Sequence, residues 1–225
     1  MPKVRYEEML VGELSAARLA APLVYVPVGS LEYHGWHLPT GFDGLHAQAL
    51  CEAAAEVTGG VVVPVTYWGT KGHEGYPGSL LIQDSTLAQL MADVLSCMAE
   101  QGYRLIVLLT GHHPEVQGAV LQHVADVHNE KRPEARAVVL DPFSLHPTDK
   151  HLEHAGKIET SAMLHLRPEL VDMSQLDNPE ALRAISQDCV DATREDGQQR
   201  FDEVVAALAE AVRRELPSSG GAEGQ

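Results

Sequence analysis

The chain has 225 residues, of which 44% are hydrophobic and 21% charged, a composition typical of one globular domain with a full core. Its formal net charge of −16 argues against nucleic acid and anionic membranes as partners, because both would be repelled. The three cysteines are isolated and lack CxxC spacing, which argues against a disulfide framework and a zinc–thiolate site. Without an apolar leader or a long uncharged run, the sequence predicts a cytoplasmic protein.

Apolar runs alternate between strand-like and helix-like patterns along the chain. We expect strands at residues 23–28, 61–65, 104–109 and 135–140. We expect helices at residues 6–19, 44–57, 84–99 with Asp84 as N-cap, 114–128 with Pro114 in the first turn, 160–166 and 201–216. This alternation predicts an α/β fold with three layers, α/β/α, around a mainly parallel four-stranded sheet. Residues 1–217 are treated as one domain and residues 218–225 as a disordered polar tail.

Metal-binding side chains are dense in the loop after the first strand. Glu32 and His34 are two residues apart, so on an extended segment they leave the same face. Gly41 lets the chain turn back, so that Asp43 can approach the same point. Imidazole and carboxylate without thiolate suit zinc, manganese or iron(II), and one carboxylate can bridge two ions. Right-handed crossovers place the loops after all parallel strands at one edge, where His112 should join this loop.

Four ordered segments within residues 24–166 carry a more specific signal. They read PVGSLEYHGWHLPTGFD, HEGYPGS, LLTGHH and HAGKIETS. This set resembles the creatininase (creatinine amidohydrolase) family, whose pattern is close to GSxEQHGxHLPxxTD, HxxFPGT, NGHGGN and HxGxxETS. The resemblance implies a creatininase-like four-stranded parallel sheet flanked by helices, a site with two divalent ions per chain (zinc, manganese or iron), and a homo-oligomer, often a hexamer.

Carried over to this sequence, the resemblance implies five metal ligands, Glu32, His34, Asp43, His112 and Glu159, with Asp43 bridging. His154 matches a catalytic histidine of the family. The chain departs from the pattern after His112, where Pro114 replaces a glutamate ligand and Glu115 lies one residue further on. Either Glu115 or Glu159 could complete the second ion site, and we favour Glu159, which could instead cap a helix. His154 could instead orient a ligand.

Other residues of the four segments are candidates for contact with substrate. We expect Trp36, His37, Tyr76 and His113 to touch it, although His37 and His73 are also typical of residues that only shape a loop. His154 or Glu115 is expected to pass a proton to the leaving group.

The sequence therefore predicts a metal-dependent hydrolase that acts on a small molecule. Two cations would activate a water for attack on a carbonyl, breaking a C–N bond of a cyclic amide or formamide. Two alternatives stay open at this point. One is a metal-dependent hydrolase or isomerase of a cyclic keto-polyol or sugar derivative, and the other is a metal-binding protein without catalytic activity.

Overall fold

The computed structural model describes residues 3–147 and 152–216, and the predicted tail at 218–225 lies outside them. In the described part, one sheet contains β1 (Leu23–Val28), β2 (Val61–Val62), β3 (Leu105–Thr110) and β4 (Arg136–Leu140). All pairings are parallel and the spatial order is β2-β1-β3-β4, so β1 and β3 form the centre. The predicted fold class is confirmed.

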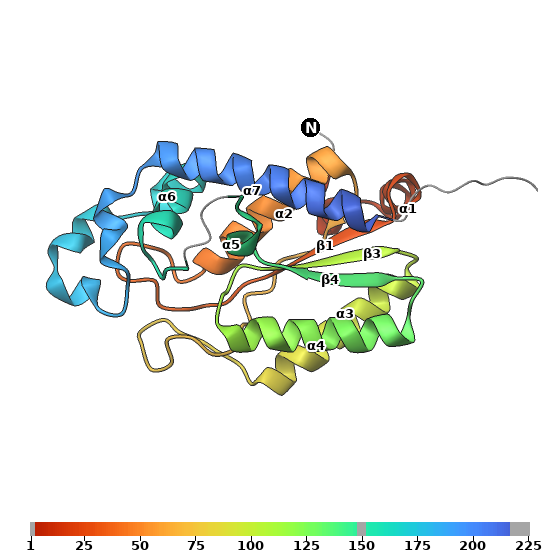
Figure 1. Ribbon diagram of the computed structural model, residues 1–225, viewed down its shortest axis with the longest axis horizontal. Coiled ribbons are helices and arrows are strands. Elements are labelled where there is room, and N and C mark those ends of the chain that lie inside the picture. The colour runs from red at the N-terminus through yellow and green to blue at the C-terminus, as the bar shows by residue number, and fades with distance from the viewer. Residues whose placement is uncertain (1–2, 148–151, 217–225) are drawn as a thin grey trace, which may run out of the picture.

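Helices cover both faces of this sheet (Figure 1). α2 (Phe42–Thr58) and α7 (Arg194–Glu215) pack on one face, and α3 (Asp84–Glu100) and α4 (Glu115–Lys131) pack on the other. Alternate residues of β1 point to opposite faces: Tyr25 contributes to the core under α2 and α7, while Val24 and Val26 contribute to the core under α3 and α4. Burial on both faces explains why the central strands are apolar without alternation.

Shorter elements complete the described chain. η1 (Tyr6–Glu8) and α1 (Val11–Ala20) precede the sheet, and α5 (Pro142–Leu145) and α6 (Lys157–Leu166) follow it. Four 3-10 helices then lead to α7, namely η2 (Pro168–Leu170), η3 (Met173–Asp177), η4 (Pro179–Leu182) and η5 (Gln187–Asp191). No helix among the described residues is both long enough and apolar enough to cross a bilayer.

Three helices begin earlier than predicted, and the shifts of two of them, α2 and α6, concern candidate ligands. α2 starts at Phe42 rather than 44, because the backbone N–H of Leu45 already donates to the carbonyl of the N-cap Gly41 at 3.1 Å. α6 starts at Lys157 rather than 160. Asp43 and Glu159 therefore both lie in the first turn of a helix, where the helix dipole stabilises a carboxylate.

The other differences from the predicted elements have local causes. β2 ends at Val62 instead of 65, since Pro64 has no N–H for a strand ladder. Gln83, not Asp84, is the N-cap of α3, and Pro114 is the N-cap of α4 rather than part of its first turn. The predicted first helix divides into η1 and α1, and α7 begins at Arg194, well before 201.

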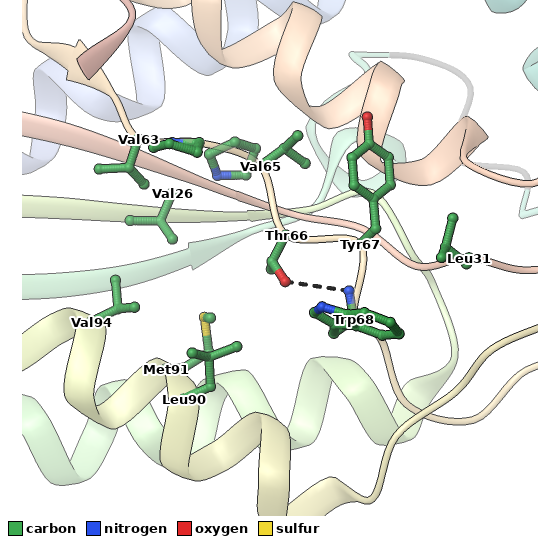
Figure 2. Close-up of a pocket in the computed structure, with 12 residues that line it drawn as sticks. Val26, Leu31, Val63, Val65, Thr66, Tyr67, Trp68, Leu90, Met91 and Val94 are labelled. Carbon is green, nitrogen blue, oxygen red and sulfur yellow. Dashed lines mark hydrogen bonds between the residues drawn. The ribbon is translucent and has the colours of Figure 1, made fainter. Parts of the chain in front are cut away.

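An apolar groove lies between the chain after β2 and helix α3 (Figure 2). Its volume is about 550 Å³, and Val26, Val65, Trp68, Leu90 and Met91 are among the residues that line it. Trp68 is 50% exposed at this groove. None of the candidate metal ligands is among the lining residues, so the groove is separate from the ligands predicted above.

We predict that Gly111→Ala destabilises the protein by about 1–3 kcal/mol through overpacking. A Cβ at residue 111 would lie 2.1 Å from the carbonyl oxygen of Asp43 and 3.0 Å from Cβ of Ala47. Gly118→Ala is the matched control, because Gly118 lies within α4 and has no atom within 4 Å of an added Cβ. It should stabilise by about 0.5–1 kcal/mol. Urea denaturation measures both, and equal effects of the two substitutions would contradict the close approach.

Candidate metal centre

The carboxyl ends of β1 and β3 lie directly against the start of α2. A Cβ at Gly29 would lie 2.3 Å from the backbone nitrogen of Gly44, so only glycine permits this approach. Ser30, which follows β1, donates its hydroxyl to Oδ2 of Asp43 at 2.5 Å. The loop from 29 to 41 thus leaves the sheet and returns to the same edge, carrying the first candidate ligands with it.

Asp43 lies between two imidazoles. Its Oδ1 is 3.1 Å from Nε2 of His34, and its Oδ2 is 2.9 Å from Nδ1 of His112. Oε2 of Glu32 is 3.0 Å from the same nitrogen of His112, and Oε2 of Glu159 is 3.6 Å from Nε2 of His34. Each of these five side chains belongs to a residue at most 3% exposed. The structure therefore brings together all five residues that were predicted as ligands.

Backbone carbonyls determine which nitrogen of each histidine faces the carboxylates. Nε2 of His112 donates to the carbonyls of Thr70 and Lys71 at 3.0 and 2.9 Å, and Nδ1 of His34 donates to the carbonyl of Glu32 at 3.1 Å. A carbonyl oxygen only accepts, so these nitrogens carry the hydrogen of the neutral ring. Nδ1 of His112 and Nε2 of His34 are left to present lone pairs, as in histidines that ligate metals.

Mutual attraction sets the charges of this cluster. Burial by itself would lower the pKa of His112 and His34, but contact with Asp43 outweighs it and raises the pKa values to about 11 and about 9. Burial would raise the pKa of Glu32, yet hydrogen bonds from His112 and His73 bring it to about 2. Protons and divalent cations would compete for the same two imidazole nitrogens, so the cluster should bind cations more tightly as pH rises.

Two overlapping sets of donor atoms have the chemistry of a cation site. Glu32, Asp43 and His112 form one set, and His34, Asp43 and Glu159 form the other, with the donor atoms of each set within 4.8 Å of one another. Each set offers one imidazole and two carboxylates, which suits zinc, manganese or iron(II). Nε2 of His34 is buried without a hydrogen bond of regular geometry, although two carboxylate oxygens face it. The residues therefore fit divalent metal binding, and Asp43 belongs to both sets.

Glu159 is held from outside the cluster by the start of α6. Its Oε2 accepts a hydrogen bond from the backbone N–H of Ala155 at 2.6 Å, and its own N–H donates to Oε1 of Glu153 at 2.8 Å. Ala155 has φ of 47°, a left-handed conformation that costs a non-glycine residue about 1–3 kcal/mol. Burial raises the pKa of Glu159 to about 8, so among the three carboxyl groups of the cluster it is the one that most readily takes a proton.

His154 lies beside the cluster and contacts two other imidazole rings. Its ring centroid is 4.5 Å from that of His34 and 4.0 Å from that of His73. Nε2 donates to the carbonyl of Tyr33 at 2.7 Å, which leaves the lone pair on Nδ1. Burial and the charge of His34 lower the pKa of His154 to about 4, so the ring is neutral at pH 7. Together with Glu32 and His34, it also forms a third possible donor set.

The structure places Glu115 away from this cluster. Its residue is exposed in the first turn of α4 and lines a surface groove with Asp84, Ser85 and His123. It belongs to none of the donor sets found among the described residues. Of the two carboxylates that could complete the second ion site, Glu159 is therefore the one that lies with His34 and Asp43.

Two of the four predicted substrate contacts are Trp36 and Tyr76. Trp36 is 53% exposed in the loop after β1. Tyr76 packs against Tyr33, with ring centroids 5.0 Å apart, and edge-on against His73 at 5.5 Å. Their contact with substrate stays a prediction.

The other two predicted contacts are engaged with the protein itself. His37 is 1% exposed, and its Nε2 lies 3.0 Å from the hydroxyl of Thr160 in α6. Nδ1 of His113 lies 3.1 Å from Oδ1 of Asp141, and its ring meets Phe143 edge-on at 4.4 Å. These contacts favour a structural role for both residues over direct contact with substrate. His37 contacts α6, and His113 contacts the residue that follows β4.

Sequence reasoning missed Ser30 and undervalued His73. The hydroxyl of Ser30 orients Asp43, and the only sequence signal for it is its position directly after β1 in the first family segment. His73 was interpreted as a loop residue, yet its Nδ1 lies 2.8 Å from Oε1 of Glu32. Its place at the head of the segment HEGYPGS could have indicated this role.

Fold and donor set together define an α/β protein with a candidate metal centre at the carboxyl edge of its sheet. The family model described as creatinine amidohydrolase matches residues 7–212. The chain belongs to the creatininase family of hydrolases, as the four segments predicted.

Named relatives within the family differ in what they act on. The chain is 30% identical to creatinine amidohydrolase of Pseudomonas putida, over 94% of this chain and 98% of that protein. It is 30% identical to the mycofactocin precursor peptide peptidase of Mycolicibacterium smegmatis, over 89% and 88%. It is 26% identical to the 3-dehydro-scyllo-inosose hydrolase of Thermotoga maritima, over 75% of this chain and 58% of that protein.

Solved structures agree with this family. A crystal structure of creatinine amidohydrolase superposes with a TM-score of 0.84 at 24% identity, over 96% of this chain and 99% of that one, which supports the fold. A mutant creatininase in a zinc–zinc form and a manganese creatininase each superpose with a TM-score of 0.82 at 25% identity, over 96% of this chain and 100% of theirs. Creatininases are thus known in zinc and manganese forms.

We predict that Glu159→Gln changes how the stability of the metal-stripped protein depends on pH. The pKa of Glu159 is about 8 in the folded chain and about 4.3 in an unfolded one, so the folded state holds more protons in between. Unfolding free energy of the wild type should therefore fall, relative to the glutamine variant, as pH rises from about 5 to about 8. Chelator-treated protein and urea titrations measure the difference, and parallel curves would contradict the raised pKa.

Proposed function

We propose that the protein is a metal-dependent hydrolase in which two divalent cations per chain are held by Glu32, His34, Asp43, His112 and Glu159. The observation that carries this proposal is the placement of Asp43, whose two oxygens face different imidazoles, Oδ1 toward His34 and Oδ2 toward His112. A carboxylate so placed can bridge two ions, as in two-metal hydrolytic sites. The three buried carboxylates also need positive charge, since burying them unpaired is costly.

Cations in such a site lower the pKa of water and polarise a carbonyl oxygen. The chain's own residues then have distinct tasks. The five ligands fix the position of the reacting groups, and Ser30 and the backbone of residue 155 hold two of the carboxylates in place. His154, neutral with a lone pair on Nδ1, accepts a proton from the attacking water and returns it to the leaving nitrogen.

The bond that we propose to be cleaved is a C–N bond of a small cyclic amide or formamide. One observation supports this substrate class: two relatives that match the chain at 30% identity are named as an amidohydrolase and a peptidase, and both activities break an amide-type bond. Metal assistance suits an amide, because the carbonyl is a weak electrophile and the leaving nitrogen needs a proton.

A second candidate is the hydrolysis or rearrangement of a cyclic keto-polyol. It is favoured by the 3-dehydro-scyllo-inosose hydrolase among the relatives, and by the segment Thr110-Gly111-His112-His113-Pro114, which departs from the family pattern NGHGGN. The remaining alternative is a metal-binding protein without activity. It gives no role to the neutral His154 that lies beside the donor atoms of Glu32 and His34.

The test is a substrate panel with purified protein loaded with zinc or manganese. We expect release of ammonia or amine from cyclic amides or formamides, and no ring opening of cyclic keto-polyols. Asp43→Asn should lower the rate at least about a hundredfold, because Asp43 belongs to two donor sets. Glu115→Gln is the matched control, since Glu115 is exposed on α4 and should leave the rate unchanged. Turnover of keto-polyols alone would support the second candidate, and no turnover on either panel would leave the non-catalytic reading.

We further propose that the chain works in the cytoplasm as a homo-oligomer, with a hexamer as the expected state. Family likeness supports this assembly, and the exposed Trp36 and Trp68 are apolar surface that a subunit contact could cover. Light scattering after size-exclusion chromatography should give a mass several times that of the 24.4 kDa chain. A mass of one chain at working concentration would reject the proposal.

A further inference from the structure

The two oxygens of Glu32 have different partners. Oε2 faces Nδ1 of His112 at 3.0 Å, toward the first donor set of the candidate metal centre. Oε1 is held on the other side by His73, whose backbone N–H donates to it at 2.7 Å and whose ring Nδ1 lies 2.8 Å away. A carboxylate whose second oxygen is engaged twice by a neighbour has little freedom to rotate.

The loop is built so that His73 can close on Glu32. Gly72 has φ of 123°, and a Cβ there would lie 2.2 Å from Oε1 of Glu32 and 3.0 Å from the ring of His112. Only glycine therefore lets the backbone pass this close to the carboxylate. The backbone conformation of Gly72 therefore brings residue 73 close to Glu32.

Neighbouring rings fix the orientation of the His73 imidazole. It stacks on His154 with centroids 4.0 Å apart and an interplanar angle of 23°, and Tyr76 meets it edge-on at 5.5 Å and 84°. The plane of the ring is set by these contacts, and its Nδ1 is directed at Glu32. The same stack places it between Glu32 and the candidate proton carrier His154.

We infer that His73 is a positioning residue, which holds Glu32 as a ligand through one oxygen and so sets the affinity of the cation bound by Glu32, Asp43 and His112. The inference rests on the proposed function, since it concerns one of its two cations. Partners that orient a ligand from outside typically contribute about ten- to a hundredfold in metal affinity.

The effect should be confined to one of the two cations. The second donor set, His34, Asp43 and Glu159, does not include Glu32. Its outer carboxylate is held instead by the backbone N–H of Ala155. Loss of the His73 side chain therefore leaves the second set intact, and this asymmetry separates a positioning role from a general loss of structure.

The test is a titration of the metal-stripped full chain with Mn²⁺ or Zn²⁺. Binding is measured by calorimetry and by competition with a chelator. His73→Phe keeps a ring to stack on His154 but lacks the Nδ1 donor, and should weaken one of two binding events about ten- to a hundredfold, with the other within about twofold. His73→Asn, whose side-chain N–H can reach Oε1, should restore most of the affinity. His123→Phe removes an exposed histidine of α4 and should change neither event.

Each outcome decides the matter. Two wild-type events that are unchanged in His73→Phe would overturn the positioning role while leaving the proposed function in place. Equal weakening of both events, or no rescue by His73→Asn, would also overturn it, because the effect would then not come from the bond to Glu32. Absence of any bound ion in the wild-type chain would overturn the proposed function itself, and this inference with it.

Discussion

The structure depends on one buried carboxylate, that of Asp43, which lies between two histidine side chains. Asp43 presents one oxygen to His34 and the other to His112, at 3.1 and 2.9 Å. Neither imidazole could be buried beside so many carboxylates without carrying a proton or a cation, and the raised pKa values of both histidines express this demand. The arrangement is therefore one in which positive charge is required at two points about one carboxylate.

The fold supplies this geometry through the parallel sheet. The ends of β1 and β3 are adjacent, and Gly29 and Gly111 allow the first turn of α2 to lie against both of them. A second helix, α6, brings Glu159 from the far side. Both carboxylates in first turns gain from the helix dipoles, so secondary structure and electrostatics favour the same placement. Residues far apart in sequence are in this way brought together at one edge of the sheet.

The sequence predicts much of this arrangement. Continuous apolar runs identify the central strands, because a parallel sheet buries both faces, and the four ordered segments identify the family and its candidate ligands. Helix starts were less predictable: α2 begins at Phe42 because the N–H of Leu45 donates to the carbonyl of Gly41, a contact that no propensity encodes. In the same way β2 was predicted too long. The run of valines is typical of a strand, but Pro64 has no N–H to donate to the neighbouring strand.

Side-chain direction was the hardest part to predict. Glu115 lies three residues after His112. Because the side chains of successive helix residues point in directions about 100° apart, a shift of one position along the chain can turn a carboxylate from the cluster to solvent. The contact of His73 with Glu32 depends on the positive φ of Gly72, and the bracing contact of His37 depends on α6, more than a hundred residues further along the chain. Such contacts follow from tertiary structure and leave little trace in a single sequence.

The most direct test of the central claim is a crystal structure of the full chain grown with manganese or zinc, with anomalous scattering measured at the absorption edge of the added metal. The account predicts two peaks per chain about 3.5–4 Å apart, one beside Nδ1 of His112 and one beside Nε2 of His34, with Asp43 contacting both. A single peak, or a pair of peaks that Asp43 does not bridge, would contradict it.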